Sequence, residues 1–260
     1  MLLAQIEQYW EKRAESYSQV NQHEFATGQD QIWFQEIQKH LPKERTLKIL
    51  DIGTGPGFFA ILLARQGYDV TAVDYTEAML EQARENAGEL AKRIHFYQMD
   101  AQNLDFPDGM FDVVISRNLT WTLEKPQKAY AEWMRVLREG GRLLNFDANW
   151  YHHLFNEEKR KGYEADRERV EAMDLEDHYT CTNIDAMEEI ARQVPMSRIM
   201  RPTWDVRMLK KYTEGQIQVD EQVWRRVWDR TEQVNYASTP MFLVSAIKKS
   251  TVSEWAAESA

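Results

Sequence analysis

Cysteine is almost absent from this chain of 260 residues, which contains Cys181 alone. A single cysteine leaves no disulfide within the chain and no cysteine-based zinc site. Long apolar runs are absent too, because the longest, residues 58–64, falls far short of the roughly 20 residues that cross a bilayer. The N-terminal residues have no basic stretch ahead of an apolar one, so they do not resemble a signal peptide. We therefore expect a cytoplasmic protein without a membrane span.

Positive charge is in deficit, since 32 lysines and arginines stand against 42 aspartates and glutamates, for a net charge of −10. A surface that binds nucleic-acid phosphates is normally basic, so this balance argues against a nucleic-acid partner. We also expect no metal site, because no motif has a spacing specific for one. The expected partner is a small molecule, and the chain is expected to be a monomer or a homodimer. Its length suits one large α/β domain, or such a domain with a lid.

Residues 47–60 predict a buried strand, a glycine turn and a buried helix, the unit that forms a nucleotide-type site at the carboxyl end of a parallel sheet. Glycine at positions Gly53, Gly55 and Gly57 lets the backbone take angles that a side chain forbids, and lets a ligand approach the main chain. The dinucleotide pattern G-x-G-x-x-G requires glycine where Phe58 stands. No lysine followed by serine or threonine closes the loop, so it is not a P-loop.

Two carboxylates accompany the turn: Asp51 lies two residues before Gly53, and Asp74 ends a second predicted strand, residues 69–74. In this type of fold, a carboxylate at the tip of the second strand accepts hydrogen bonds from ribose hydroxyls. The pattern D-x-G-x-G-x-G with the later Asp74 resembles the class I methyltransferases that depend on S-adenosyl-L-methionine (SAM), in the style of the ubiquinone and menaquinone biosynthesis group. The resemblance implies SAM as cofactor and S-adenosyl-L-homocysteine (SAH) as product. The alternative is a generic doubly wound domain whose turn merely needs glycine.

Two further segments carry the same resemblance. Residues 99–107 follow the third predicted strand and are similar to the family's D-A-x-x-L-P-F, which implies that Asp100 accepts from the adenine amino group and that Ala101 donates its N–H to the ring. A turn residue after a strand is the alternative for Asp100. Residues 136–143 resemble the common V-L-K-P-G-G-x-L, which is an architectural signal. The other cofactor contacts that we expect from the resemblance are Thr54, Tyr75, Arg117 and Tyr17.

The expected fold is α/β: a doubly wound, Rossmann-like, seven-stranded and mostly parallel sheet, with the last strand antiparallel, plus a helical lid. We expect four parts along the chain. They are an N-terminal helical lid segment (1–45), the SAM-binding Rossmann-like core (46–149), a helical cap insertion (150–203) and the C-terminal part of the core sheet (204–250). The lid and the cap are implied by the resemblance, because such segments cover the cofactor and the acceptor in similar enzymes.

The segment after the strand of residues 111–116 faces the transferable methyl group in similar folds. Asn118 and Trp121 lie there without the prolines of amino-type DNA methyltransferases, which argues against a DNA base as acceptor. We expect both to line the acceptor pocket; a packed junction is the alternative. The other residues expected at this pocket are Trp150 and Tyr151 at the start of the cap, and His23 in a loop after the first helix, where a solvated position is the alternative.

His152 and His153 are the candidates for a general base, because imidazole titrates near neutrality. Adjacent residues of a helix point to different faces, so the two do not form a metal pair. The expected reaction is in-line displacement, in which an O, N, S or C nucleophile of a small-molecule methyl acceptor attacks the sulfonium methyl. A base is required only where the acceptor must lose a proton. Alignment of the reactants and exclusion of water are expected to supply most of the catalysis.

Three other functions agree with parts of the pattern. An NAD-dependent oxidoreductase is disfavoured by the glycine spacing and by Phe58. An RNA methyltransferase is disfavoured by the acidic balance. A SAM-binding protein without catalysis, acting as a sensor or interaction partner, would use the same loop, so the sequence leaves that alternative open.

Overall fold

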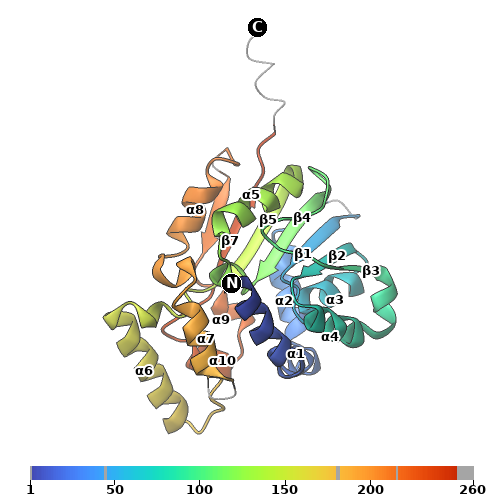
Figure 1. Ribbon diagram of the computed structural model, residues 1–260. Coiled ribbons are helices and arrows are strands. Elements are labelled where there is room, and N and C mark those ends of the chain that lie inside the picture. Colours follow the sequence, from blue (N-terminus) through green and yellow to red (C-terminus); the bar gives the residue numbers. More distant parts are fainter. Residues whose placement is uncertain (1, 44–45, 180–181, 215, 251–260) are drawn as a thin grey trace, which may run out of the picture.

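The structure is a computed structural model that describes residues 2–43, 46–179, 182–214 and 216–250, so Cys181 lies outside the described ranges. Its centre is a seven-stranded sheet with the order β3-β2-β1-β4-β5-β7-β6 (Figure 1). Strands β1 to β5 are parallel, and β7 is antiparallel to β5 and β6. The predicted fold class is therefore confirmed. The strands are β1 (Lys48–Ile52), β2 (Asp69–Asp74), β3 (Ile94–Gln98), β4 (Phe111–Arg117), β5 (Leu137–Asp147), β6 (Ile217–Asp220) and β7 (Phe242–Ile247).

Helices cover both faces of this sheet (Figure 1). Successive strand residues point to opposite faces, so Leu50 of β1 packs in one hydrophobic cluster with α5 and α8, and Ile49 packs in another with α2 and α3. Burial on both sides explains why the parallel strands are apolar along most of their length. The helices are α1 (Leu2–Ala26), α2 (Gln29–Gln38), α3 (Phe58–Arg65), α4 (Glu77–Ala87), α5 (Pro126–Val136), α6 (Glu157–Ala172), α7 (Ile184–Ala191), α8 (Thr203–Leu209), α9 (Trp224–Val227) and α10 (Arg230–Asn235), with short 3-10 turns η1 (Gly88–Arg93), η2 (Thr120–Thr122), η3 (His152–Leu154) and η4 (Pro195–Arg198).

The strand order reverses beside β1. The chain goes from β1 to β2 on one side and later returns to β4 on the other side. In open α/β sheets, ligands bind at such a point, in the crevice outside the carboxyl ends of the strands. Helix α1 is fastened near this edge, because Ser18 Oγ and Gln22 Nε2 donate to Asn86 Oδ1 of α4 at 3.2 and 2.9 Å.

The N-terminal and cap segments are helical, as expected, but one detail differs. His23 lies within α1 and is exposed, so the prediction that it sits in a loop is wrong. The helix continues because no residue interrupts it before Gly28, which has a left-handed backbone with φ of +77°. Residues 150–203 contain η3, α6, α7 and η4. Figure 1 shows α6 projecting from the body of the molecule. The division into a lid, a core and a cap stays a prediction.

Candidate functional site

A cavity lies at the carboxyl ends of β1, β2 and β4 and is covered by α1. Helix α1 faces it with one side, since Leu3, Ile6, Trp10 and Tyr17 recur at helical spacings. The sheet side supplies the polar wall. Its lining includes the residues expected from the sequence at the cofactor, namely Asp51, Gly53, Thr54, Gly55, Asp74, Tyr75, Asp100, Ala101 and Arg117, together with Asn118. The structure thus brings together residues from four strand ends and one distant helix.

The glycine turn between β1 and α3 has a left-handed backbone at Gly53, Gly55 and Gly57, with φ of +67°, +53° and +91°. Residues with a side chain adopt these angles only under strain. A Cβ added to Gly53 would lie 2.8 Å from the side chain of Leu119, and one added to Gly55 would lie 3.6 Å from the ring of Tyr17. The turn therefore presents bare backbone to the cavity at these two positions. Gly57 does not line the cavity and packs against α4 instead.

Gly57→Ala is expected to lower the free energy of unfolding by about 2–3 kcal/mol. The left-handed backbone accounts for roughly 1–2 kcal/mol of this loss. The rest comes from the new Cβ, which would lie 3.0 Å from the Cβ of Ala83. Gly67→Ala is a matched control, because Gly67 has φ of +88° and nothing within 4 Å of the added atom. Denaturant-induced unfolding measures both, and equal losses would contradict the crowding at Ala83.

The Asp74 carboxylate lies at the tip of β2. Its Oδ2 accepts the N–H of Gly55 and its Oδ1 accepts the N–H of Thr76, both at 2.9 Å. Each oxygen has a second lone pair, so the carboxylate keeps the capacity to accept two ligand hydroxyls. Burial raises the pKa of Asp74, and the backbone hydrogen bonds oppose that rise. The group is therefore suited to bind a vicinal diol.

Asp51 lies at the end of β1 and is only 2% exposed. Its Oδ2 accepts the hydroxyl of Thr54 at 2.6 Å. Burial raises the pKa of Asp51 to about 7, although the Thr54 hydrogen bond and the charge of Arg117 act in the opposite direction. The charge at this end of the cavity therefore depends on pH close to neutrality.

Asp100 is a turn residue that also lies in the cavity lining. Its Oδ1 accepts the backbone N–H of Gln102 at 2.8 Å and the side-chain amide of Gln102 at 3.1 Å, so it shapes the turn after β3. Asp100 and Ala101 also line the cavity. Both hydrogen bonds go to one oxygen, and no residue in the described ranges donates to Oδ2. That oxygen remains available to a ligand amino group.

Arg117 ends β4 and is the one cationic side chain among the described residues that line the cavity. Its Nη1 and Nη2 donate to the two carboxylate oxygens of Glu24 at 2.6 and 3.0 Å. The guanidinium also lies 4.3 Å from the ring centroid of Phe58. Burial lowers the pKa of Arg117, but the charge and hydrogen bonds of Glu24, together with Tyr17 and Glu232, raise it by more in total, so the guanidinium stays charged. Because Glu24 belongs to α1, the pair also ties that helix to the sheet.

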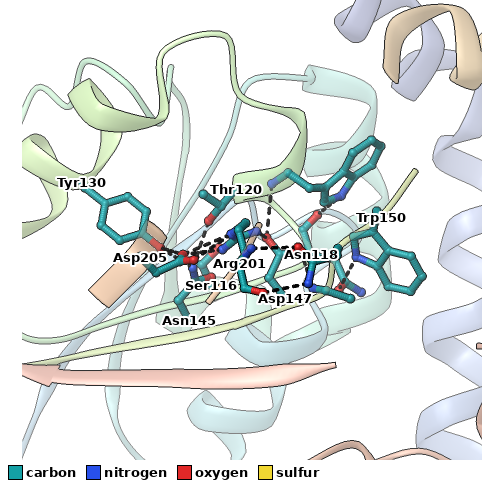
Figure 2. Close-up of polar contacts among 12 residues, drawn as sticks. Ser116, Asn118, Thr120, Tyr130, Asn145, Asp147, Trp150, Arg201 and Asp205 are labelled. Atoms are coloured by element: carbon teal, nitrogen blue, oxygen red, sulfur yellow. Dashed lines mark hydrogen bonds and ion pairs between the residues drawn. The ribbon is translucent and has the colours of Figure 1, made fainter. Parts of the chain in front are cut away.

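Asn118 follows β4 and lines the cavity with an unusual backbone, φ of +56°. Two tryptophans hold it from behind: Trp150 Nε1 donates to its Oδ1 at 3.3 Å and Trp121 Nε1 donates to its carbonyl oxygen at 2.8 Å (Figure 2). The ring of Tyr151 lies 5.1 Å from that of Trp121. Trp121, Trp150 and Tyr151 are not among the lining residues, so their place in an acceptor pocket stays a prediction.

The histidines expected near the chemistry are also absent from the described cavity lining. His153 stacks on Tyr163 with ring centroids 4.2 Å apart, and its Nε2 lies 3.7 Å from Glu188 Oε1. Burial lowers the pKa of His153 to about 4 and also lowers the pKa of His152. Both rings are therefore neutral at pH 7. Their use as a general base stays a prediction, and for His23 the exposed face of α1 agrees with the solvated alternative.

The sequence interpretation missed part of the cavity wall. The helical spacing of α1 was the available signal, since the aromatic stripe that contains Trp10 and Tyr17 extends to Ile6 and Leu3. The missed lining residues include Leu3, Ile6, Glu7, Trp10 and Asn21 of α1, Phe58 and Phe59 of α3, and Leu119, Thr122, Leu123 and Glu124 after β4.

In the described ranges, no helix is both long and apolar enough to cross a membrane. In the same ranges, no group of three or more His, Cys, Asp or Glu side chains is placed to hold a metal ion.

Residues 50–145 match the protein family described as a methyltransferase domain. A demethylmenaquinone methyltransferase of Bacteroides fragilis is 32% identical over 144 residues, which are 54% of this chain and 58% of the relative. A phosphatidylethanolamine N-methyltransferase of Cereibacter sphaeroides is 34% identical over 99 residues, which are 37% of this chain and 48% of the relative. The chain therefore spans about half the length of the curated relatives that it matches.

A solved structure from Methanococcus maripaludis, which carries a provisional description as a SAM-dependent methyltransferase, has a TM-score of 0.60 with this chain. The identity is 21%, and the match covers 93% of this chain and 94% of the other. At this identity the likeness shows the fold. The family match includes Asp51, Asp74, Asp100 and Arg117, so it covers the same part of the chain as the polar wall of the cavity.

Proposed function

We propose that this chain is a SAM-dependent methyltransferase, which moves the sulfonium methyl of SAM to a nucleophilic O, N, S or C of a small molecule. The observation that carries the proposal is the convergence of Asp74, Asp100 and the glycine turn on one cavity. A dinucleotide would instead need the third glycine that Phe58 replaces.

The lining residues fit the parts of SAM. Asp74 is suited to the ribose diol, because each of its oxygens already holds the loop and keeps one lone pair. Asp100 Oδ2 and the N–H of Ala101 suit the amino group and the ring of adenine. The bare backbone at Gly53 and Gly55 leaves room for the methionine part. Arg117 is the cationic lining residue that suits the methionyl carboxylate, since it keeps N–H donors beyond those that bind Glu24.

Bound SAM supplies a methyl group that its positive sulfur already activates. The residues of the chain then need to align the acceptor and exclude water. Helix α1 contributes to both, since its side chains cover the cavity. The charge of the wall is also favourable for a cation. The lining contains five carboxylates and one guanidinium, and Glu24 neutralises that guanidinium. The carboxylates are Glu7, Asp51, Asp74, Asp100 and Glu124.

The acceptor is a small molecule in this proposal, and its methylated atom stays open. The names of the two curated relatives point to different acceptors, a quinone precursor and a phosphatidylethanolamine. Asn118 is the lining residue that we assign to the acceptor side, because it follows β4 next to the glycine turn. His152 and His153 would act as a base only after η3 moved toward the cavity.

Isothermal titration calorimetry with SAM, SAH and NAD tests the proposal. We expect SAM and SAH to bind and NAD to give no heat of binding. NAD binding without SAM binding would overturn the proposal and support the oxidoreductase alternative. A chain that binds SAM but transfers no methyl is distinguished by incubation with methyl-labelled SAM and a panel of small-molecule acceptors. Label that stays entirely in SAM across the panel would favour the sensor alternative.

We also propose that residues 1–45 act as a lid and residues 150–203 as a cap. The face of α1 that lines the cavity supports the first assignment.

The proposed location is the cytoplasm, and the presence of a single cysteine agrees with that reducing compartment. The proposed assembly is a monomer or a homodimer, and sedimentation velocity separates these two.

A further inference from the structure

A buried cluster of charges lies behind the cavity wall, where the chain leaves the cap (Figure 2). Arg201 is its centre: Nη1 donates to Asp147 Oδ2 at 2.6 Å, Nε donates to Asp205 Oδ2 at 3.0 Å, and Nη2 donates to Asp205 Oδ1 at 2.7 Å. Arg201 is 2% exposed, and Asp147 and Asp205 are both 0% exposed. None of the three lines the cavity.

Hydrogen bonds connect this cluster to the cavity. Asp147 Oδ2, which binds Arg201, also accepts the backbone N–H of Trp121 at 3.2 Å. The indole of Trp121 donates in turn to the carbonyl oxygen of Asn118, and Asn118 lines the cavity. Asp147 and Trp121 therefore link Arg201 to Asn118 through hydrogen bonds. We call residues 118–124 the acceptor-side wall.

The same wall is held from a second direction. Tyr130 of α5 donates its hydroxyl to Asp205 Oδ1. Asn145 of β5 donates to the hydroxyl oxygen of Tyr130 at 2.8 Å and to that of Thr120 at 3.0 Å, and Thr120 belongs to η2 in the wall. The backbone of Arg201 is fixed as well, since its N–H and carbonyl both pair with the side chain of Asn149, at 2.9 and 2.8 Å. The arginine is thus a rigid junction between α5, β5, α8 and the wall.

Stability alone is a poor explanation for this arrangement. Removing three charges from water is costly, and apolar residues of similar volume often replace such groups without loss of stability. A buried network whose charged groups are all hydrogen-bonded instead selects one geometry over its alternatives. The wall contains a feature that needs this selection, because Asn118 has a strained left-handed backbone. Strained residues persist where the surrounding contacts fix them.

We propose that Arg201 is a positioning residue that, through Asp147 and Trp121, holds the acceptor-side wall in the geometry that the cavity requires. The meaning of this role for methyl transfer rests on the function proposed above. The geometric role is independent of it. A residue near the end of the cap segment thereby sets the shape of a pocket whose own residues lie about eighty positions earlier in the sequence.

Hydrogen exchange followed by mass spectrometry tests this on Arg201→Lys, without any ligand. Lysine keeps the charge but lacks the fork that reaches two carboxylates. We expect amides of residues 118–124 to exchange about tenfold faster or more, with exchange in α3 unchanged. The dissociation constant of SAH is expected to rise about tenfold, because Leu119 of the wall packs against Gly53 of the glycine turn.

Arg226→Lys is the matched control, since Arg226 also pairs with two carboxylates, Glu36 and Asp220, away from the cavity. It should leave exchange of the wall at the wild-type rate. If Arg201→Lys does not fold, Trp121→Phe removes the indole donor and leaves all three charges, and it should also speed exchange at the wall. Wild-type exchange of residues 118–124 in Arg201→Lys, or in Trp121→Phe where Arg201→Lys does not fold, would overturn the proposal. Equal acceleration in α3 would overturn it too, by showing a general loss of stability. A wild type that bound neither SAM nor SAH would refute the proposed function alone.

Discussion

Asp74→Ala is expected to weaken the binding of SAM and SAH by at least about 100-fold, which corresponds to roughly 3 kcal/mol. Hydrogen bonds to a charged acceptor contribute about 1.5–3 kcal/mol each, and this carboxylate is placed to accept two ribose hydroxyls. The substitution has a second effect, because the N–H groups of Gly55 and Thr76 lose their acceptor. The glycine turn then loses the contact that holds its backbone against β2. Calorimetry with both ligands measures the change.

Asp69→Ala is the matched control for this substitution. Asp69 begins the same strand that Asp74 ends, is exposed, and lies at the opposite edge of the sheet. Its removal should change the affinity for SAM by less than about twofold. Thermal unfolding of Asp74→Ala without ligand should occur at a lower temperature than that of the wild type, because the N–H groups of Gly55 and Thr76 lose their acceptor. Retention of SAM affinity within threefold would show that the ribose does not bind at the tip of β2.

The cofactor side of the site was predictable because its determinants are local in the sequence. The strand of residues 69–74 was predicted with the bounds that β2 has in the structure. Parallel strands align their carboxyl ends, so three carboxylates at three predicted strand ends must lie near one another. Asp51, Asp74 and Asp100 accordingly line one cavity. Sequence spacing and sheet topology were sufficient for this part.

The acceptor side was less predictable because it depends on long-range contacts. Trp121 was expected at the pocket from its position after β4, yet its indole turns back to the carbonyl of Asn118. Asp147 accepts the backbone N–H of Trp121 and also binds Arg201, which lies 54 residues farther along the chain than Asp147. No periodicity connects such positions. The same holds for Glu24, which lies in the last turns of α1, where the sequence predicted a loop, and meets Arg117 only in the folded chain.

Asp51→Asn is expected to have the second large effect, because it should make the protein more stable at pH 8 and weaken the binding of SAM. Its pKa is about 7 in the folded chain, against 3.8 for an unperturbed aspartate. The folded state therefore holds a proton that the unfolded state releases, so the stabilising contribution is complete below about pH 4 and is lost as the pH rises to 7. Between pH 5 and pH 8 the loss is about 2.5 kcal/mol. Asp51→Asn removes this titration, keeps an acceptor for Thr54, and should be the more stable protein at pH 8.

The same substitution should weaken binding of the cationic cofactor. In the wild type, affinity for SAM is expected to increase through pH 7 as Asp51 becomes ionised, since a carboxylate in a cavity of low polarity attracts a sulfonium by on the order of 1–2 kcal/mol. SAH lacks the sulfonium charge and is the control ligand. Calorimetry at pH 6 and pH 8 should show an increase of about tenfold for SAM, a smaller one for SAH, and neither in Asp51→Asn. Equal pH dependence for both ligands would place the sulfonium away from Asp51. Urea unfolding at pH 5 and pH 8 completes the test, because only the wild type should lose stability through this group.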